Sequence, residues 1–231
     1  MSREQKPKAD YFKSIMAITR KDLSAELRSR ELLSAMLVFS LLVILIYYFT
    51  LELDIKNRNA ITAGALWVTF SFAGTLGLNR SMAIEKDRGC LDGLLLAPVD
   101  RSVIFFGKAL SNLAFMFIVE AIVIPVYAIM YNVNLLIPGF LGVTILGSVG
   151  YISVGTLISA MSVQTRTRDV LLPILLFPLV IPILVAAVKA SNGYLLNLQW
   201  SEISPWINVL LVYNVIFLAV SFMVFDQVVE E

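Results

Sequence analysis

The chain has 231 residues, of which 58% are hydrophobic and 15% charged, and its formal net charge is +1. The mean hydropathy of +0.83 excludes a soluble domain of average makeup. The absence of histidine removes the commonest general base and metal ligand, and a single cysteine, Cys90, excludes an intramolecular disulfide. We therefore expect a membrane protein without a familiar catalytic or metal site.

The first thirty residues are rich in charge and lack the apolar core of a cleavable signal peptide. Apolar residues recur at helical spacing from Tyr11 to Leu27, with charged residues around the rest of the cylinder. This pattern predicts an amphipathic helix that lies along the cytoplasmic membrane surface, within a cytoplasmic N-terminus of residues 1–33. The alternative is an amphipathic helix packed on a soluble partner.

Six apolar runs follow, each long enough to supply the roughly 20 residues that a membrane-spanning helix needs. None alternates as a barrel strand would, so the sequence predicts an all-α membrane protein. Its six transmembrane helices would occupy residues 34–225, followed by a cytoplasmic tail at 226–231. The predicted spans are Ser34–Leu51, Ile61–Leu78, Ser102–Met130, Phe140–Met161, Val170–Ala190 and Trp206–Phe225.

Lysine and arginine residues gather on one side of these predicted helices. They precede the first span and follow the second and the fourth, whereas the opposite connections hold only Lys56 and Arg58, beside two acidic residues. Because connections rich in lysine and arginine stay in the cytoplasm, both termini are predicted to be cytoplasmic. The acidic tail does not weigh against this orientation, since the rule counts basic residues and not net charge.

Two predicted spans carry residues that are unusual inside a membrane. Glu120 lies about midway along the third span, where an ionisable side chain is costly. It either contacts a substrate or a proton, or it is a hydrogen-bonded group that fixes helix packing, with Pro125 opening the helix nearby. In the fifth span, Pro173, Pro178 and Pro182 predict a helix that is kinked or broken.

Other candidate sites are weaker. Trp200 and Trp206 surround the last external loop, where they are expected to be interfacial anchors; a stacking platform for a flat aromatic ligand is the alternative. The chain has no G-x-x-x-x-G-K-[ST], H-E-x-x-H or G-x-S-x-G motif. It is therefore not expected to be an enzyme on its own, and neither catalytic nor metal-binding residues are predicted.

The cytoplasmic stretch between the second and third spans differs from every other connection. From Glu85 to Arg101 it reads EKDRGCLDGLLLAPVDR, in which a helix-stopping Gly89 precedes a run of leucines set among acidic residues. Exposed leucines are unfavourable unless a partner covers them. The stretch therefore predicts a rigid apolar projection that inserts into a groove on a cytoplasmic protein.

This stretch, the interfacial helix and the six spans together resemble the type 2 ABC exporter (ABC-2) permeases. In that family the corresponding loop, residues 79–101 here, is the coupling helix. The resemblance implies that it docks on a separate ATPase subunit, which binds ATP and whose closure rocks the membrane helices. The implied docking residues are Glu85, Asp87, Gly89, Leu91, Asp92 and Leu94, with Arg166 and Arg168 in the loop Ser162–Asp169 as a second contact.

Longer strings are similar to the cytochrome c maturation protein B (CcmB) family, the permease subunit of a haem exporter. They are FAGTLGLNRSMAIEKDRGCLDGLLLAPVDRSVIFFGK (72–108), VEAIVIP (119–125) and VQTRTRDVLLPILLFPLVIP (163–182). The resemblance implies a homodimer in the bacterial inner membrane that works with the ATPase CcmA, with CcmC, with the small CcmD and with the haem chaperone CcmE. ATP hydrolysis would drive haem delivery or the release of haem-loaded chaperone on the external side.

The resemblance implies that haem is a possible cargo, and that this chain itself binds no cofactor directly. Two alternatives stay open at this point. One is an ABC-2 permease that exports a lipid, a glycan or a drug, and the other is a nucleotide-independent channel or scaffold. Cys90 and Asn214 depart from the small residue and the aspartate that are expected at these places in the family.

Overall fold

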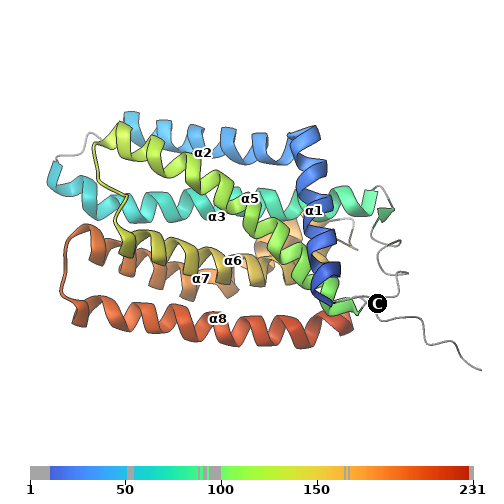
Figure 1. The fold of residues 1–231 in the computed structure, drawn as a ribbon. Helices are drawn as coiled ribbons and strands as arrows, with labels where there is room; N and C mark the ends of the chain where they lie inside the picture. The colour runs from blue at the N-terminus through green and yellow to red at the C-terminus, as the bar shows by residue number, and fades with distance from the viewer. Residues whose placement is uncertain are drawn as a thin grey trace, which may run out of the picture.

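The structure, a computed structural model, describes residues 11–50, 55–87, 89–90, 93, 100–163, 165 and 167–228, without the side chains of 55–60 and 226–228. All regular secondary structure in this part of the chain is helical, which confirms the predicted all-α class (Figure 1). The helices are α1 (Tyr11–Ser29), α2 (Glu31–Thr50), α3 (Ile55–Asp87), α5 (Arg101–Tyr131), α6 (Pro138–Ser162), α7 (Arg168–Leu195) and α8 (Trp200–Val228).

Six of these helices, α2 to α8, are long and apolar enough to cross a membrane, as predicted. They run side by side in one bundle (Figure 1). The most apolar windows of α3 and α6 are each 72% buried within the bundle, compared with 22% in α2 and in α8. Helices α3 and α6 are therefore the centre of the bundle, and α2 and α8 present most of their apolar surface to the surroundings.

Two helices differ from the prediction: α3 is longer than expected, and α7 is not broken at its prolines. Helix α3 continues through residues 79–87, which were assigned to the coupling loop, because neither glycine nor proline interrupts the chain before Gly89. Helix α7 is continuous through its three prolines, so the helix is not broken there. Its packing against α3, α6 and α8 supports this, since neighbouring helices compensate for lost backbone hydrogen bonds.

Helix α1 lies across one end of the bundle, roughly perpendicular to the other helices (Figure 1). A left-handed residue, Arg30 with φ 56°, turns the chain between α1 and α2. Just before this turn, the carboxylate of Glu26 accepts a hydrogen bond of 2.9 Å from the backbone N–H of Leu33, in the first turn of α2. A carboxylate at a helix N-terminus is stabilised by the unpaired N–H groups and the helix dipole, so this contact fixes α1 to α2.

Helix α1 exposes some of its apolar residues and buries two of its acidic ones, unlike a typical helix on the surface of a soluble protein. Phe12 and Met16 are 72% and 52% exposed, whereas Asp22 and Glu26 are buried. Ile15 joins a small core with residues of α3, α5, α6 and α8 at this end of the bundle. An exposed apolar face favours the predicted position of α1 at a membrane interface.

Candidate coupling site

Residues 88–100 connect the end of α3 to the start of α5 and lie within the stretch Glu85–Arg101 that the sequence singled out; we call them the coupling segment. Its described part begins with a turn, in which the N–H of Gly89 donates a hydrogen bond of 3.0 Å to the carbonyl of Lys86. Gly89 has φ 66°, a left-handed conformation that suits glycine. Glycine at this place therefore lets the chain leave α3 sharply.

The structure describes part of the predicted docking surface. Leu91, Asp92, Leu94 and Arg166 lie outside the described residues. Cys90 and Gly93, which the structure does describe, are both exposed. The role of this surface in docking stays a prediction.

The two predicted contact loops are joined at their edges by an ion pair. The guanidinium of Arg168, at the start of α7, donates two hydrogen bonds of 3.0 Å to the two carboxylate oxygens of Asp87, at the end of α3. A second link joins the same helices, since the Asn79 amide donates a hydrogen bond of 2.9 Å to Asp169. A two-pronged arginine–carboxylate pair fixes orientation as well as distance. The end of α3 and the start of α7 are thereby held together.

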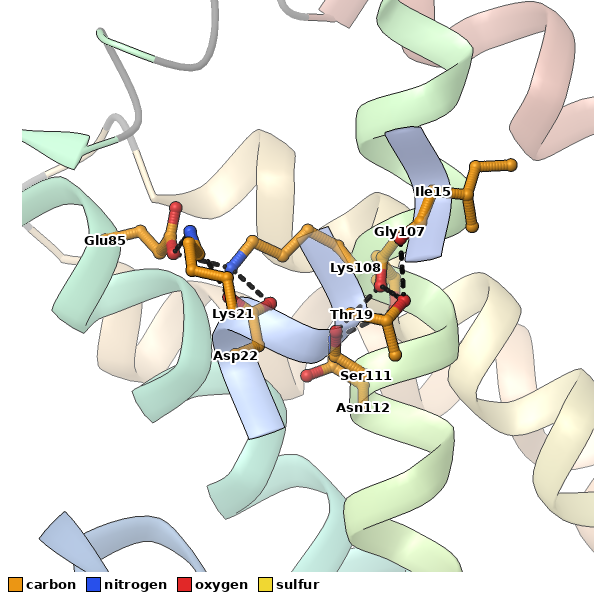
Figure 2. Close-up of polar contacts among 10 residues, drawn as sticks. Ile15, Thr19, Lys21, Asp22, Glu85, Gly107, Lys108, Ser111 and Asn112 are labelled. Atoms are coloured by element: carbon orange, nitrogen blue, oxygen red, sulfur yellow. Dashed lines mark hydrogen bonds and ion pairs between the residues drawn. The ribbon is translucent and has the colours of Figure 1, made fainter. Parts of the chain in front are cut away.

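Glu85, predicted to face the ATPase, lies inside the protein with three other charged residues. We call Lys21, Asp22, Glu85 and Lys108 the charge cluster; they come from α1, α3 and α5 (Figure 2). The Lys108 ammonium lies 2.8 Å from a carboxylate oxygen of Asp22 and 2.8 Å from one of Glu85. Lys21 lies 2.6 Å from Glu85 and 3.3 Å from Asp22. The four formal charges sum to zero.

Burying the charged residues of this cluster together has a high cost in free energy unless the charges are paired. Lys108 is only 1% exposed, and Asp22 and Glu85 are 9% and 7% exposed. Removing a charge from water is costly, so a buried ammonium is tolerated only when carboxylates surround it closely. Lys21, at the edge of the cluster, is about half exposed. Partial burial lowers its pKa, but the hydrogen bond to Glu85 and the charges of both carboxylates outweigh this effect, so the pKa is raised above 10.5.

Packing between α1 and α5 supports the charge cluster (Figure 2). Gly107, next to Lys108, allows close approach: a Cβ atom at this position would lie 2.8 Å from the Cβ of Ile18. The hydroxyl of Thr19 also donates to the Gly107 carbonyl, at 3.2 Å. A cavity of about 60 Å³ borders Asp22, Glu85 and Lys108. This volume has room for water beside the charged groups.

Sequence reasoning did not single out Asp22 or Lys108. In the sequence, Lys108 is one of the basic residues after the second predicted span that indicate orientation, and Asp22 is one of the charged residues around the predicted amphipathic helix. The available signal was the position of Lys108 inside an otherwise apolar predicted span, where a charge demands a partner. The identity of that partner depends on where α1 lies, and periodicity does not reveal it.

The other candidate residues lie away from the charge cluster. Glu120 is about 18 Å further along α5, at 1.5 Å per residue, and it is buried. The hydroxyl of Ser148, in α6, donates a hydrogen bond to it. Pro125 and the three prolines of α7 lie inside continuous helices. Trp200, the first residue of α8, is exposed, whereas Trp206 is partly buried against the hydrophobic core of the helix bundle.

The described residues contain no group of three or more histidine, cysteine, aspartate or glutamate side chains arranged to hold a metal ion. The arrangement of these contacts can transmit movement from one helix to another. Both flanks of the coupling segment are tied to neighbouring helices, one through Asp87 and Glu85 and the other through Lys108. A force applied to this segment would therefore act on several helices at once.

Comparison with known proteins places the chain in a family. The model of the CcmB protein family matches residues 13–230. A protein of Bradyrhizobium diazoefficiens named Heme exporter protein B is 23% identical over 185 residues, which is 80% of this chain and 83% of the relative. Proteins of the same name from Rhodobacter capsulatus and Paracoccus denitrificans are 27% and 26% identical, over 73% and 75% of this chain and 78% and 80% of those relatives. The chain belongs to the CcmB protein family.

Proposed function

We propose that this chain is the membrane permease subunit of an ATP-driven haem exporter that serves cytochrome c maturation. The observation that carries the proposal is the match to the CcmB family across residues 13–230, together with relatives named Heme exporter protein B. Six helices fit to cross a membrane are consistent with a permease. The chain supplies no nucleotide-binding loop, so ATP is hydrolysed by a separate subunit.

The coupling segment is the part of the chain that this ATPase would move. Asp87 and Arg168 are proposed to mark the edge of the docking surface, because their ion pair joins the two loops that the resemblance assigns to docking. Leu91, Asp92 and Leu94 are proposed to enter a groove on the ATPase. Movement of this surface would tilt α3, α5 and α7 and so drive haem delivery, or release of the haem-loaded chaperone, on the external side.

The proposed assembly contains two copies of this chain and the ATPase CcmA, with CcmC, CcmD and the haem chaperone CcmE as further partners. It lies in the bacterial inner membrane, with the coupling segment, α1 and both termini in the cytoplasm. The excess of lysine and arginine in the connections at that end supports this orientation.

The proposal is tested with a charge reversal at the docking edge. Asp87→Arg breaks the pair with Arg168 and replaces a negative charge by a positive one on the surface that would face the ATPase. The variant should insert normally, yet ATP hydrolysis by the purified assembly and formation of holo-cytochrome c in cells should both fall. The matched control is Glu31→Arg, which breaks an exposed pair with Arg80. Neither residue is among the implied docking residues, so both activities should stay unchanged.

Each alternative gives a different result. If the wild-type chain copurifies with an ATPase but its gene can be deleted without loss of holo-cytochrome c, the chain exports another cargo such as a lipid, a glycan or a drug. If no ATPase copurifies and Asp87→Arg has no effect, the chain is a nucleotide-independent channel or scaffold, and the proposal fails.

A further inference from the structure

Lys108 occupies a singular place in the charge cluster. It belongs to α5, which leaves the coupling segment, and its ammonium contacts Glu85 of α3, which enters the segment. The same ammonium contacts Asp22 of α1. Both ends of the segment and the helix that crosses the bundle thus meet at one nitrogen atom (Figure 2).

Helix α1 extends this connection to a fourth helix. Four residues after Asp22, the Glu26 carboxylate accepts the hydrogen bond from the backbone of Leu33 in α2. Along α1 in the other direction, Thr19 bonds to the α5 backbone at Gly107. A displacement at Lys108 can therefore reach α2 through α1 as well as α3 and α5 directly.

We propose that Lys108 is a positioning residue that locks α1 and both flanks of the coupling segment into one rigid unit. In this unit, movement of the segment is passed to the membrane helices α2, α3 and α5 together, instead of being absorbed by local bending. The inference rests on the proposed function, because it assigns a mechanical role within ATP-driven coupling.

Stability alone does not account for the charge cluster. Well-packed apolar residues in place of a buried ion pair are often neutral or stabilising, so a bundle of this kind does not need a buried lysine to fold. A buried ammonium between two carboxylates instead fixes the relative positions of three helices, since any separation leaves a charge without its partner. That property suits a joint that must transmit force without opening.

The test uses a variant that removes the contacts of Lys108 with Asp22 and Glu85 without leaving an unpaired buried charge. Lys108→Met alone is expected to destabilise the bundle, so it is combined with Asp22→Asn. The remaining pair, Lys21 and Glu85, stays neutral and keeps α1 joined to α3, but the ionic contacts of α5 with α1 and α3 are lost. The matched control is Arg80→Met with Glu31→Gln, which removes an exposed ion pair of 2.6 Å between α2 and α3.

Three quantities are measured on the complete assembly with its ATPase. They are the amount of inserted protein, the rate of ATP hydrolysis and the rate of haem delivery to the chaperone. A spin-label pair at the exposed positions Arg20 and Leu110, in a Cys90→Ser background, reports the distance between α1 and α5 with and without a non-hydrolysable ATP analogue.

The expected result is uncoupling. The Lys108→Met, Asp22→Asn variant should insert and hydrolyse ATP as the wild type does, while haem delivery per ATP falls about tenfold. The distance between α1 and α5 should stay constant in the wild type when the analogue binds, and should change in the variant. The control should match the wild type in all three quantities.

Two results would overturn the inference. If haem delivery per ATP is unchanged in the variant, the joint transmits nothing. If ATP hydrolysis and haem delivery fall only in step with the amount of inserted protein, Lys108 has a structural role and no more. Failure of the proposed function is seen separately, because the wild-type assembly would then hydrolyse no ATP or would deliver no haem, and the inference would fall with it.

Discussion

Replacing Lys108 by methionine should destabilise the protein far more than breaking an ion pair on its surface. Lys108 is 1% exposed and contacts two carboxylates at 2.8 Å. Its removal leaves Asp22 and Glu85 buried with only the half-exposed Lys21 to compensate. Breaking a buried pair from one side costs about 3–5 kcal/mol. At about 2–4 °C per kcal/mol for a chain of this size, the apparent Tm should fall by about 6–20 °C.

The measurement is thermal unfolding in detergent, followed by intrinsic fluorescence. Arg80→Met is the control, because its pair with Glu31 is about half exposed on both sides and should contribute about 0–1 kcal/mol. Adding Asp22→Asn to Lys108→Met should recover part of the lost stability, since one of the two uncompensated carboxylates is removed. The reasoning is refuted if Lys108→Met lowers the Tm no more than Arg80→Met, or if the double variant is no more stable than the single one.

Three further results are expected. Gly107→Val should cost about 1–3 kcal/mol by forcing Ile18 away from α5, and would be seen as a lower Tm together with a lost contact between α1 and α5 by cross-linking. Trp67→Phe should lower the free energy of unfolding by about 0.5–1.5 kcal/mol, because it removes the indole hydrogen bond of 3.0 Å to Ser191. Adding Ser191→Ala to this variant should lower it little further, because the hydrogen bond is already lost. Glu120→Gln should retain haem delivery if this residue only fixes packing, because an amide also accepts the serine hydrogen bond; a loss of delivery with normal insertion would show a contact with cargo or a proton.

The helical architecture was predictable because its signals are local. Apolar runs of sufficient length determine the six spans, and the structure differs mainly at their ends. The extension of α3 to Asp87 follows from the lack of a helix-breaking residue before Gly89, a signal that was present in the sequence. The continuity of α7 through its prolines was not predictable in this way, because it depends on the helices that pack against it.

The candidate site was predictable in part. The sequence identified the stretch that begins at Glu85 and the second loop that contains Arg168, and the structure joins the two through Asp87. It did not reveal that Glu85 points inward. That orientation depends on Lys108, 23 positions further along the chain, and on Asp22 in a helix that lies across the bundle. Such contacts arise from tertiary packing, which single-sequence periodicity does not encode.

Helix α1 shows why the same periodicity can support two opposite orientations. The apolar face of an amphipathic helix is normally its buried face, yet Phe12 and Met16 are exposed here while Asp22 and Glu26 are buried. In a membrane protein the apolar face has a second possible environment, the lipid interface, so hydrophobicity alone does not decide which side meets the protein. Lys108 favours the observed orientation, because a cation inside the bundle end requires carboxylates close by and α1 carries one at the matching position. Charge pairing thus contributes to the orientation of α1, together with the hydrogen bonds of Thr19 to α5 and of Glu26 to α2.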